Sequence, residues 1–157
     1  MSLKPYEIDR LAHDLVLKFR DKKDVLGESH KMRMATAYGL ERFWGEHLRL
    51  QRESRDKADF WRETWTTLCK ILKDAGITLP NDRVDPNNTA AIKAMTDKLW
   101  AFDLPNEQVN PDQDIEQCNK QRKIALSVLT ELCDSLVWWT QRYKKPRNEV
   151  GGSTDAR

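Results

Sequence analysis

Apolar residues recur at spacings of three and four along most of this chain, which is the pattern of helices that bury one face. The clearest N-terminal example is the stretch 5–19, where Pro5 suits the first helical turn because its missing N–H would have no intrahelical partner there. One face of this stretch carries Ile8, Leu11, Ala12, Leu15, Val16 and Phe19. A polar connection containing Gly27 follows and ends the predicted helix.

The same spacing predicts two further helices in the middle of the chain. The second helix spans 29–54, with Ser29 as its candidate N-cap, and the third spans 56–75, with Gly76 as the residue that stops it. No proline or glycine lies at the junction between them. They could therefore form one long helix or a tight hairpin, and we favour a break near Ser54.

Two more helices complete the pattern. A loop rich in proline, asparagine and aspartate precedes a fourth helix over 88–102, and a fifth covers 111–143, with Asn110 as its cap and Pro111 in its first turn. A helix of about 30 residues is about 45 Å long, so this one would form the spine of a bundle. Arg122 interrupts its apolar seam, which otherwise comprises Ile115, Cys118, Ala125, Leu129, Leu132, Leu136, Trp139 and Tyr143.

These elements predict an all-α fold, namely an up-and-down helical bundle of about five helices with one long C-terminal helix. No segment shows the alternation typical of a strand. We expect residues 1–145 to form a single domain and residues 146–157 to form a disordered polar tail. Arg122 then marks the end of the bundle, a buried ion pair, or an opening through which a nucleic-acid strand passes.

The composition of the chain excludes few classes of function. Lysine and arginine number 27 and aspartate and glutamate 25, so the net charge of +2 does not by itself require a nucleic-acid partner. The N-terminus has no apolar signal segment, and no stretch approaches the roughly 20 apolar residues of a membrane span. We therefore expect a cytoplasmic protein without a membrane partner.

The cysteines and the acidic residues indicate neither a metal site nor a cofactor. Cys69, Cys118 and Cys133 lie inside helical patterns, without a C-x-x-C pair or a histidine at ligand spacing. They fit reduced, buried packing residues. The carboxylates are dispersed over polar faces, so no catalytic arrangement is suggested, and we expect a protein that is not an enzyme.

Basic residues gather on the predicted solvent faces and are candidates for contact with a phosphate backbone. These candidates are Lys31, Arg33, Arg42, Arg49, Arg52, Arg55, Lys57, Lys120, Arg122, Lys123, Lys144 and Lys145. The alternative is that they form ordinary ion pairs with acids one helical turn away. That alternative predicts the pairs Arg42–Glu46, Arg49–Glu53 and Arg55–Asp59.

The tryptophans fall into two groups. Those at positions 44, 61 and 65 lie on apolar stripes and are predicted to be core residues. Trp138 lies beside Trp139, which alone is on the main seam of the last helix. Trp138 could pack against a second helix, which we favour, or stand exposed as an anchor for a protein partner. Trp100 raises the same question.

One short motif resembles a known catalytic signature. Arg42 and His47 fit R-x4-H, which is similar to the signature of HEPN-type ribonucleases, a family of small helical bundles. The resemblance implies that the two side chains would orient and activate an RNA 2′-hydroxyl. The other reading is a half-buried His47 with Arg42 on the solvated side of the same helix.

The whole of residues 1–145 resembles the small subunits of CRISPR effector complexes in size, helical architecture and basic patches. The resemblance implies a non-catalytic subunit that packs against other protein subunits and holds single-stranded or hybrid nucleic acid without reading its sequence. Phosphate contact would then involve Arg42, Arg49, Arg52, Lys120 and Lys123. A protein–protein adaptor that uses Trp100 or Trp138 is the main alternative, and self-association stays open.

Overall fold

The computed structural model describes residues 5–102 and 111–146, and in the second range it describes side chains from residue 120 onward. The described chain is all-α, without a strand, which confirms the predicted fold class. Six α-helices and one 3-10 turn replace the five predicted helices. The elements are α1 (Pro5–Phe19), α2 (Glu28–Ala35), η1 (Thr36–Tyr38), α3 (Leu40–Leu50), α4 (Arg55–Asp74), α5 (Thr89–Ala101) and α6 (Pro111–Tyr143).

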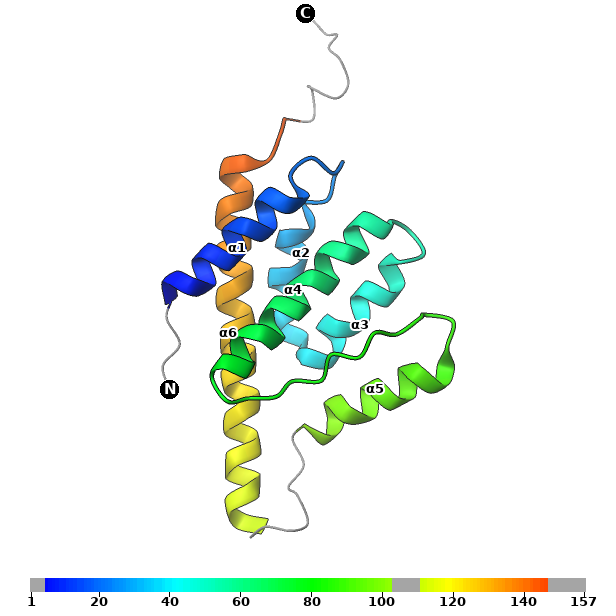
Figure 1. Cartoon of the computed structure of the whole chain (residues 1–157), viewed down its shortest axis with the longest axis vertical. Helices are drawn as coiled ribbons and strands as arrows, with labels where there is room; N and C mark the ends of the chain where they lie inside the picture. The colour runs from blue at the N-terminus through cyan, green and yellow to red at the C-terminus, as the bar shows by residue number, and fades with distance from the viewer. Residues whose placement is uncertain (1–4, 103–110, 147–157) are drawn as a thin grey trace, which may run out of the picture.

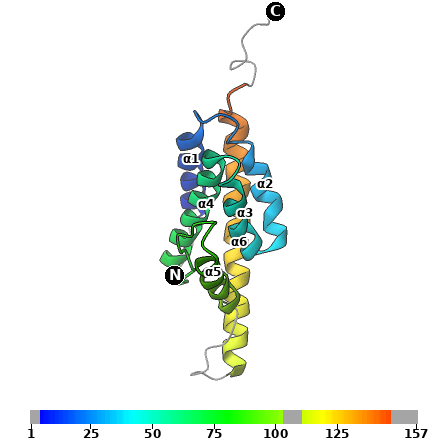
Figure 2. The ribbon, with the colours of Figure 1, turned by 90° about the vertical axis from the view of Figure 1, so that its right-hand side faces the viewer.

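The long helix α6 is the spine of the bundle (Figure 1). Helices α1 and α2 pack against its C-terminal half, and a view from the side places them on either side of it (Figure 2). Helix α4 contacts α1, α2 and α6, and α3 pairs with α4. Helix α5 lies against α3 and is connected to α4 by the extended loop 77–88.

Aromatic rings fill the centre of the bundle. The ring of Phe43 on α3 lies 4.9 Å from that of Trp61 on α4, and Phe19 on α1 lies 4.9 Å from Phe60. Trp44, Trp61 and Trp65 are all buried. The prediction that these three tryptophans belong to the core is therefore confirmed, and none of them is available to stack on a nucleic-acid base.

The predicted second helix over 29–54 is wrong in two respects. Gly39, with a φ of 96°, separates η1 from α3, in a backbone conformation that side chains with a Cβ rarely adopt. The break allows α2 to pack on α6 while α3 turns back to pair with α4. The helix also begins at Glu28, so Ser29 is a buried residue of its first turn and not its cap.

The predicted boundaries of the third helix are confirmed by its capping interactions. Ser54 is the N-cap of α4, and its side chain accepts a hydrogen bond from the backbone N–H of Lys57 at 3.4 Å. At the other end Gly76 has a φ of 85°, and the N–H of Ile77 donates to the carbonyl of Leu72 at 2.8 Å. This is the pattern of a Schellman motif, which satisfies carbonyls at the helix end.

The last two helices follow the predicted pattern where the structure describes them. Asn88 caps α5 by accepting from the N–H of Ala91 at 3.0 Å. The seam of α6 from Ala125 to Leu136 is buried. Predictions for the Asn110 cap, for the side chains of Ile115 and Cys118, and for the tail over 147–157 lie outside the described residues. No described helix is both long and apolar enough to cross a membrane.

Arg122, the one charge on the α6 seam, forms a largely buried ion pair. Its guanidinium lies 2.7 Å from the carboxylate of Glu41 on α3 and donates to the carbonyl of Leu99 on α5 at 3.0 Å. The two charged side chains are 18% and 12% exposed. Of the three readings of Arg122, the structure supports the buried pair, which joins α6 to α3 and α5.

Candidate functional site

Several of the predicted phosphate-binding residues are already paired with acids. The guanidinium of Arg49 contacts Glu46 at 2.7 Å and Glu53 at 3.0 Å, and its pKa is raised, chiefly by the hydrogen bond to Glu46. Arg33 on α2 lies 2.5 Å from Asp134 on α6. These pairs neutralise the charge that a phosphate would otherwise meet.

Lys31 and Lys57 belong to a network around a buried carboxylate. Glu28 is 2% exposed and lies 3.2 Å from Lys31 and 3.9 Å from Lys57. Its other oxygen accepts a hydrogen bond from the indole N–H of Trp61 at 2.9 Å. The two lysines therefore compensate an internal charge between α2 and α4, which the sequence pattern did not indicate because Glu28 stands outside any apolar stripe.

The remaining candidates lie at three places, on α3, on the N-terminal half of α6 and just after α6. Arg42 on α3 extends over the ring of Tyr38, 5.8 Å from its centroid. Lys120 and Lys123 are exposed on the N-terminal half of α6. After α6, Lys144 is exposed, whereas the Lys145 ammonium contacts Asp21 at 2.5 Å and lowers the pKa of that carboxyl group through this hydrogen bond.

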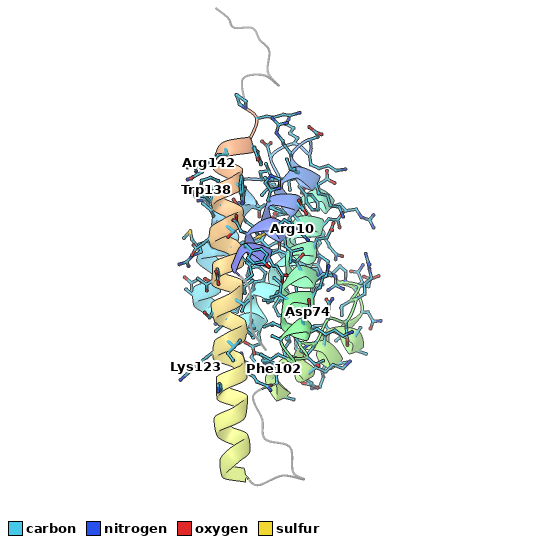
Figure 3. All side chains as sticks on the ribbon, turned by 60° about the vertical axis from the view of Figure 1, so that its left-hand side comes forward. Arg10, Asp74, Phe102, Lys123, Trp138 and Arg142 are labelled. Atoms are coloured by element: carbon cyan, nitrogen blue, oxygen red, sulfur yellow. The ribbon has the colours of Figure 1, made fainter. Side chains whose placement is uncertain are left out.

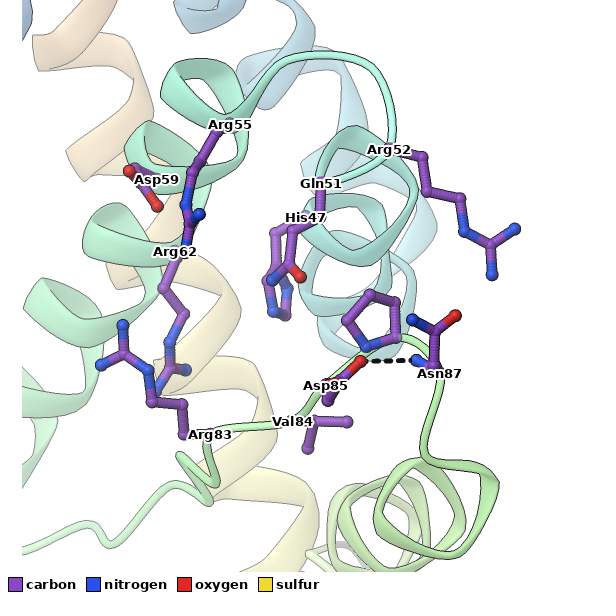
Figure 4. Close-up of a pocket in the computed structure, with 11 residues that line it drawn as sticks. His47, Gln51, Arg52, Arg55, Asp59, Arg62, Arg83, Val84, Asp85 and Asn87 are labelled. Carbon is purple, nitrogen blue, oxygen red and sulfur yellow. Dashed lines mark hydrogen bonds between the residues drawn. The ribbon is translucent and has the colours of Figure 1, made fainter.

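A cavity of about 510 Å³ lies between the C-terminal end of α3, α4 and the loop 77–88, and its arginines come from the α3–α4 connection, from α4 and from the loop (Figure 4). Arg52 and Arg55 were predicted from the sequence as phosphate contacts. Arg62 and Arg83 were not: Arg62 lies two turns after Arg55 on α4, and only the fold of the loop brings Arg83 beside it. The lining comprises His47, Gln51, Arg52, Arg55, Asp59, Arg62, Arg83, Val84, Asp85, Pro86 and Asn87.

Three of these arginines form one wall of the cavity. Figure 4 shows Arg55, Arg62 and Arg83 on the α4 side, whereas Arg52 points away. Within the described ranges none of the three forms an ion pair with a carboxylate, so the predicted pair between Arg55 and Asp59 is absent. Arg55 instead extends toward Arg62. The predicted pair of Arg42 with Glu46 is also absent, since Glu46 binds Arg49.

The positive charge of this wall exceeds the negative charge near it: Asp59 and Asp85 also line the cavity and the charge of Asp82 acts on Arg62, but no described carboxylate forms an ion pair with the three arginines. The Arg62 guanidinium donates a hydrogen bond to the amide oxygen of Asn81, which holds it in place. Burial lowers the pKa of Arg62, and the positive charge of nearby Arg83 lowers it further. Two guanidinium groups that repel each other beside a cavity favour the binding of an anion between them.

His47 lies on the opposite wall, with Gln51 beside it (Figure 4). The imidazole is 2% exposed, which is more buried than predicted, and its Nδ1 lies 2.5 Å from the carbonyl oxygen of Trp44. Burial is the main cause that lowers the pKa of His47, and the charge of Arg62 acts in the same direction. The ring is therefore neutral near pH 7.

The structure does not bring the two residues of the R-x4-H motif together. Five residues along an α-helix correspond to a rotation of about 140°, so the two side chains leave α3 in different directions. Arg42 is exposed and lies over Tyr38, whereas His47 is buried and faces the arginine cavity. The ribonuclease reading of this pair thus lacks the required proximity.

The favoured prediction that Trp138 is a core residue is wrong, because its side chain is 47% exposed. The guanidinium of Arg142 lies 3.8 Å above its ring, and Figure 3 shows both residues on the outer side of α6. Trp139 instead faces α1 and donates its indole N–H to Asp9 at 2.9 Å. Trp100 on α5 is 56% exposed.

Groups suited to metal binding or thiol chemistry do not assemble in the described part of the chain. No three histidine, cysteine, aspartate or glutamate side chains there are placed to hold a metal ion. Cys69 is half-buried, and burial raises its pKa to about 12, while burial also raises the pKa of Cys133. Both therefore stay as thiols near neutral pH.

Comparison of the chain with protein-family models, with curated proteins and with solved structures finds no match in any of the three. The function must therefore be argued from the residues of this chain.

Proposed function

We propose that this protein is a non-catalytic helical subunit that holds a nucleic-acid backbone, with a phosphate group bound in the arginine cavity. The observation that carries the proposal is the wall of Arg55, Arg62 and Arg83, none of which forms an ion pair with a carboxylate in the described part of the chain. A phosphodiester supplies the missing negative charge, and guanidinium groups bind its oxygens with two parallel hydrogen bonds.

Recognition of this kind is independent of base sequence. Guanidinium groups that contact phosphate oxygens position a strand but carry no sequence information. No tryptophan is among the residues that line the cavity, so the lining offers no indole ring for base stacking. These properties fit the general role of the CRISPR small subunits, which the chain resembles. In that role the partners of this protein would be other protein subunits and the bound strand, in the cytoplasm.

The experiment that tests the proposal is fluorescence anisotropy with labelled single-stranded oligonucleotides over a range of salt concentrations. For the wild-type protein we expect the logarithm of the affinity to fall linearly with the logarithm of the salt concentration. Arg83→Glu should weaken binding by about tenfold at low salt and reduce the salt slope by about one.

Arg10→Glu is the matched control for this substitution. Arg10 is an exposed arginine on α1, outside the cavity, and it has no ion pair in the described chain (Figure 3). Its replacement changes the net charge by the same amount but removes no contact with the cavity, so the effect should stay within about twofold. Equal losses in both variants, or no binding by the wild-type protein at low salt, would contradict the proposal.

A second function is favoured by one different observation, the half-exposed Trp138 beneath Arg142. Tryptophan and arginine are both enriched among the residues that dominate protein–protein interfaces. If the protein is an adaptor, Trp138→Ala should abolish capture of its protein partner while Arg83→Glu leaves that capture intact. The reverse outcome would favour the nucleic-acid subunit.

A further inference from the structure

The two walls of the arginine cavity present opposite hydrogen-bonding chemistry. Arg55, Arg62 and Arg83 can only donate hydrogen bonds. His47 on the facing wall is neutral, and because its Nδ1 lies against the carbonyl oxygen of Trp44, that nitrogen must carry the ring proton. A neutral imidazole has one donor and one acceptor, so Nε2 is the acceptor.

We infer that the cavity binds a ribonucleotide unit, with its phosphate on the arginine wall and its 2′-hydroxyl donating a hydrogen bond to Nε2 of His47. The protein therefore prefers RNA to DNA. This inference rests on the proposed binding of phosphate in the cavity and adds the identity of the sugar.

The distribution of charge excludes the reverse orientation of the ligand. A phosphate oxygen carries a negative charge and no proton, so it has no favourable contact with the lone pair of Nε2. A hydroxyl group has a proton to give, and the arginine wall cannot accept it. The anionic part of the ligand is therefore directed to Arg55, Arg62 and Arg83, and the hydroxyl to His47.

Other acceptors in the cavity are less suited to this role. The carboxylate of Asp85 already accepts the backbone N–H of Asn87 at 2.8 Å, and it is exposed to water. Asp59 also lines the cavity, but it is exposed to water and lies beside Arg55 on the α4 wall (Figure 4). The volume of about 510 Å³ lies within the range of small-ligand sites, so a single nucleotide unit fits.

A deoxyribose in the same place leaves the buried acceptor of His47 without a partner. One hydrogen bond to a neutral group changes affinity by about three- to tenfold. The 2′-hydroxyl is the group by which a protein distinguishes RNA from DNA at a single site.

The test compares three labelled single strands of one sequence, namely RNA, DNA and 2′-O-methyl RNA, against the full-length wild-type protein. RNA should bind about three- to tenfold more tightly than either of the others, because a 2′-O-methyl group retains its oxygen but has no proton to donate. The three salt slopes should agree, since the phosphate contacts are the same.

His47→Leu removes the acceptor and keeps a buried apolar side chain at this position. The ratio of RNA to DNA affinity should then fall to about one, with folding of the variant checked by circular dichroism. If the variant does not fold, the comparison of RNA with 2′-O-methyl RNA on the wild-type protein still decides. A 2′-O-methyl strand that binds as tightly as RNA overturns the inference.

The failure of this inference is distinguishable from the failure of the proposed function. Equal affinity for RNA and DNA, with a steep salt dependence that Arg83→Glu reduces, overturns the role of His47 and leaves phosphate binding in place. The absence of binding to all three strands at low salt overturns both.

Discussion

Two regions of this bundle use the same kind of basic side chain in opposite ways. Between α2 and α4, Lys31 and Lys57 flank the buried carboxylate of Glu28, which also accepts a hydrogen bond from Trp61. Between α3, α4 and the loop 77–88, three arginines line a cavity without a carboxylate partner among the described residues. The basic residues of the first region form ion pairs within the chain, and those of the second region form none among the described residues.

A count of basic residues therefore says little about ligand binding. An ion pair inside the fold removes a positive charge from the field that an approaching phosphate meets, whereas an unpaired guanidinium keeps it. Of the predicted phosphate contacts, Arg33 and Arg49 belong to the first kind and Arg55 to the second. Substitution of one partner at a time tests this difference between paired and unpaired basic residues.

Removal of the Glu28 carboxylate from the first region should have the largest effect on the free energy of unfolding. Glu28→Ala leaves the buried indole N–H of Trp61 without an acceptor, and the free energy of unfolding should fall by about 2 kcal/mol. Urea denaturation measures this change. Glu7→Ala, at an exposed position of α1, is the matched control and should change the free energy of unfolding by less than about 0.5 kcal/mol. Equal values for the two variants would mean that the Glu28 network does not stabilise the fold.

Protonation of His47 in the second region should have a smaller effect on the free energy of unfolding. Its pKa in the folded protein lies below the ordinary value of 6.5 because the ring is buried, so the unfolded chain takes up a proton first as the pH falls. The contribution of neutral His47 to the free energy of unfolding is therefore fully present above pH 6.5. It decreases below that pH, by at most about 1.4 kcal/mol per pH unit.

Urea denaturation between pH 7.5 and 5.5 checks this dependence by comparing the wild-type protein with His47→Leu. The variant should lose less stability over this range. The other titratable and charged groups are the same in both proteins, so they do not cause the difference. They are the histidines His13 and His30 and the charged cavity residues Arg52, Arg55, Arg62, Arg83, Asp59 and Asp85. Parallel pH profiles for the two proteins would contradict the depressed pKa.

The smallest effect is expected where an arginine is already neutralised at the surface. Arg49→Gln removes two exposed ion pairs, with Glu46 and Glu53, and should change the free energy of unfolding by no more than about 0.5 kcal/mol. Its effect on oligonucleotide affinity should remain within about twofold, well below that of Arg83→Glu. A loss at Arg49 as large as that at Arg83 would erase the distinction between paired and unpaired basic residues.

Much of the fold was predictable because local signals agreed with one another. The apolar spacing of α1, α4 and α6, the cap at Ser54 and the stop at Gly76 all reflect interactions within a few residues. The predicted continuous helix over 29–54 failed because Gly39 is compatible with a helix locally. The positive φ at that residue follows from the packing of α2 and α3 against different partners.

The candidate site was predictable only in part. Arg52 and Arg55 were found from the basic stretch that contains them, but Arg83 comes from a loop that the sequence indicated only as a turn-rich connection. Trp138 was misplaced because adjacent residues on a helix point in different directions, and the pattern does not say how many neighbouring helices cover them. Whether a basic residue meets an acid depends likewise on which helices lie side by side.

Helical periodicity and capping act over one or two turns, so the sequence pattern alone predicted the helices, most of their ends and the aromatic core. Which charges are compensated depends on the tertiary structure. It placed Glu28 between two lysines, paired Arg122 with Glu41, and left Arg55, Arg62 and Arg83 facing a neutral histidine across a cavity. Electrostatic compensation depends on distances between residues far apart in the chain, and only the packing of the helices sets those distances.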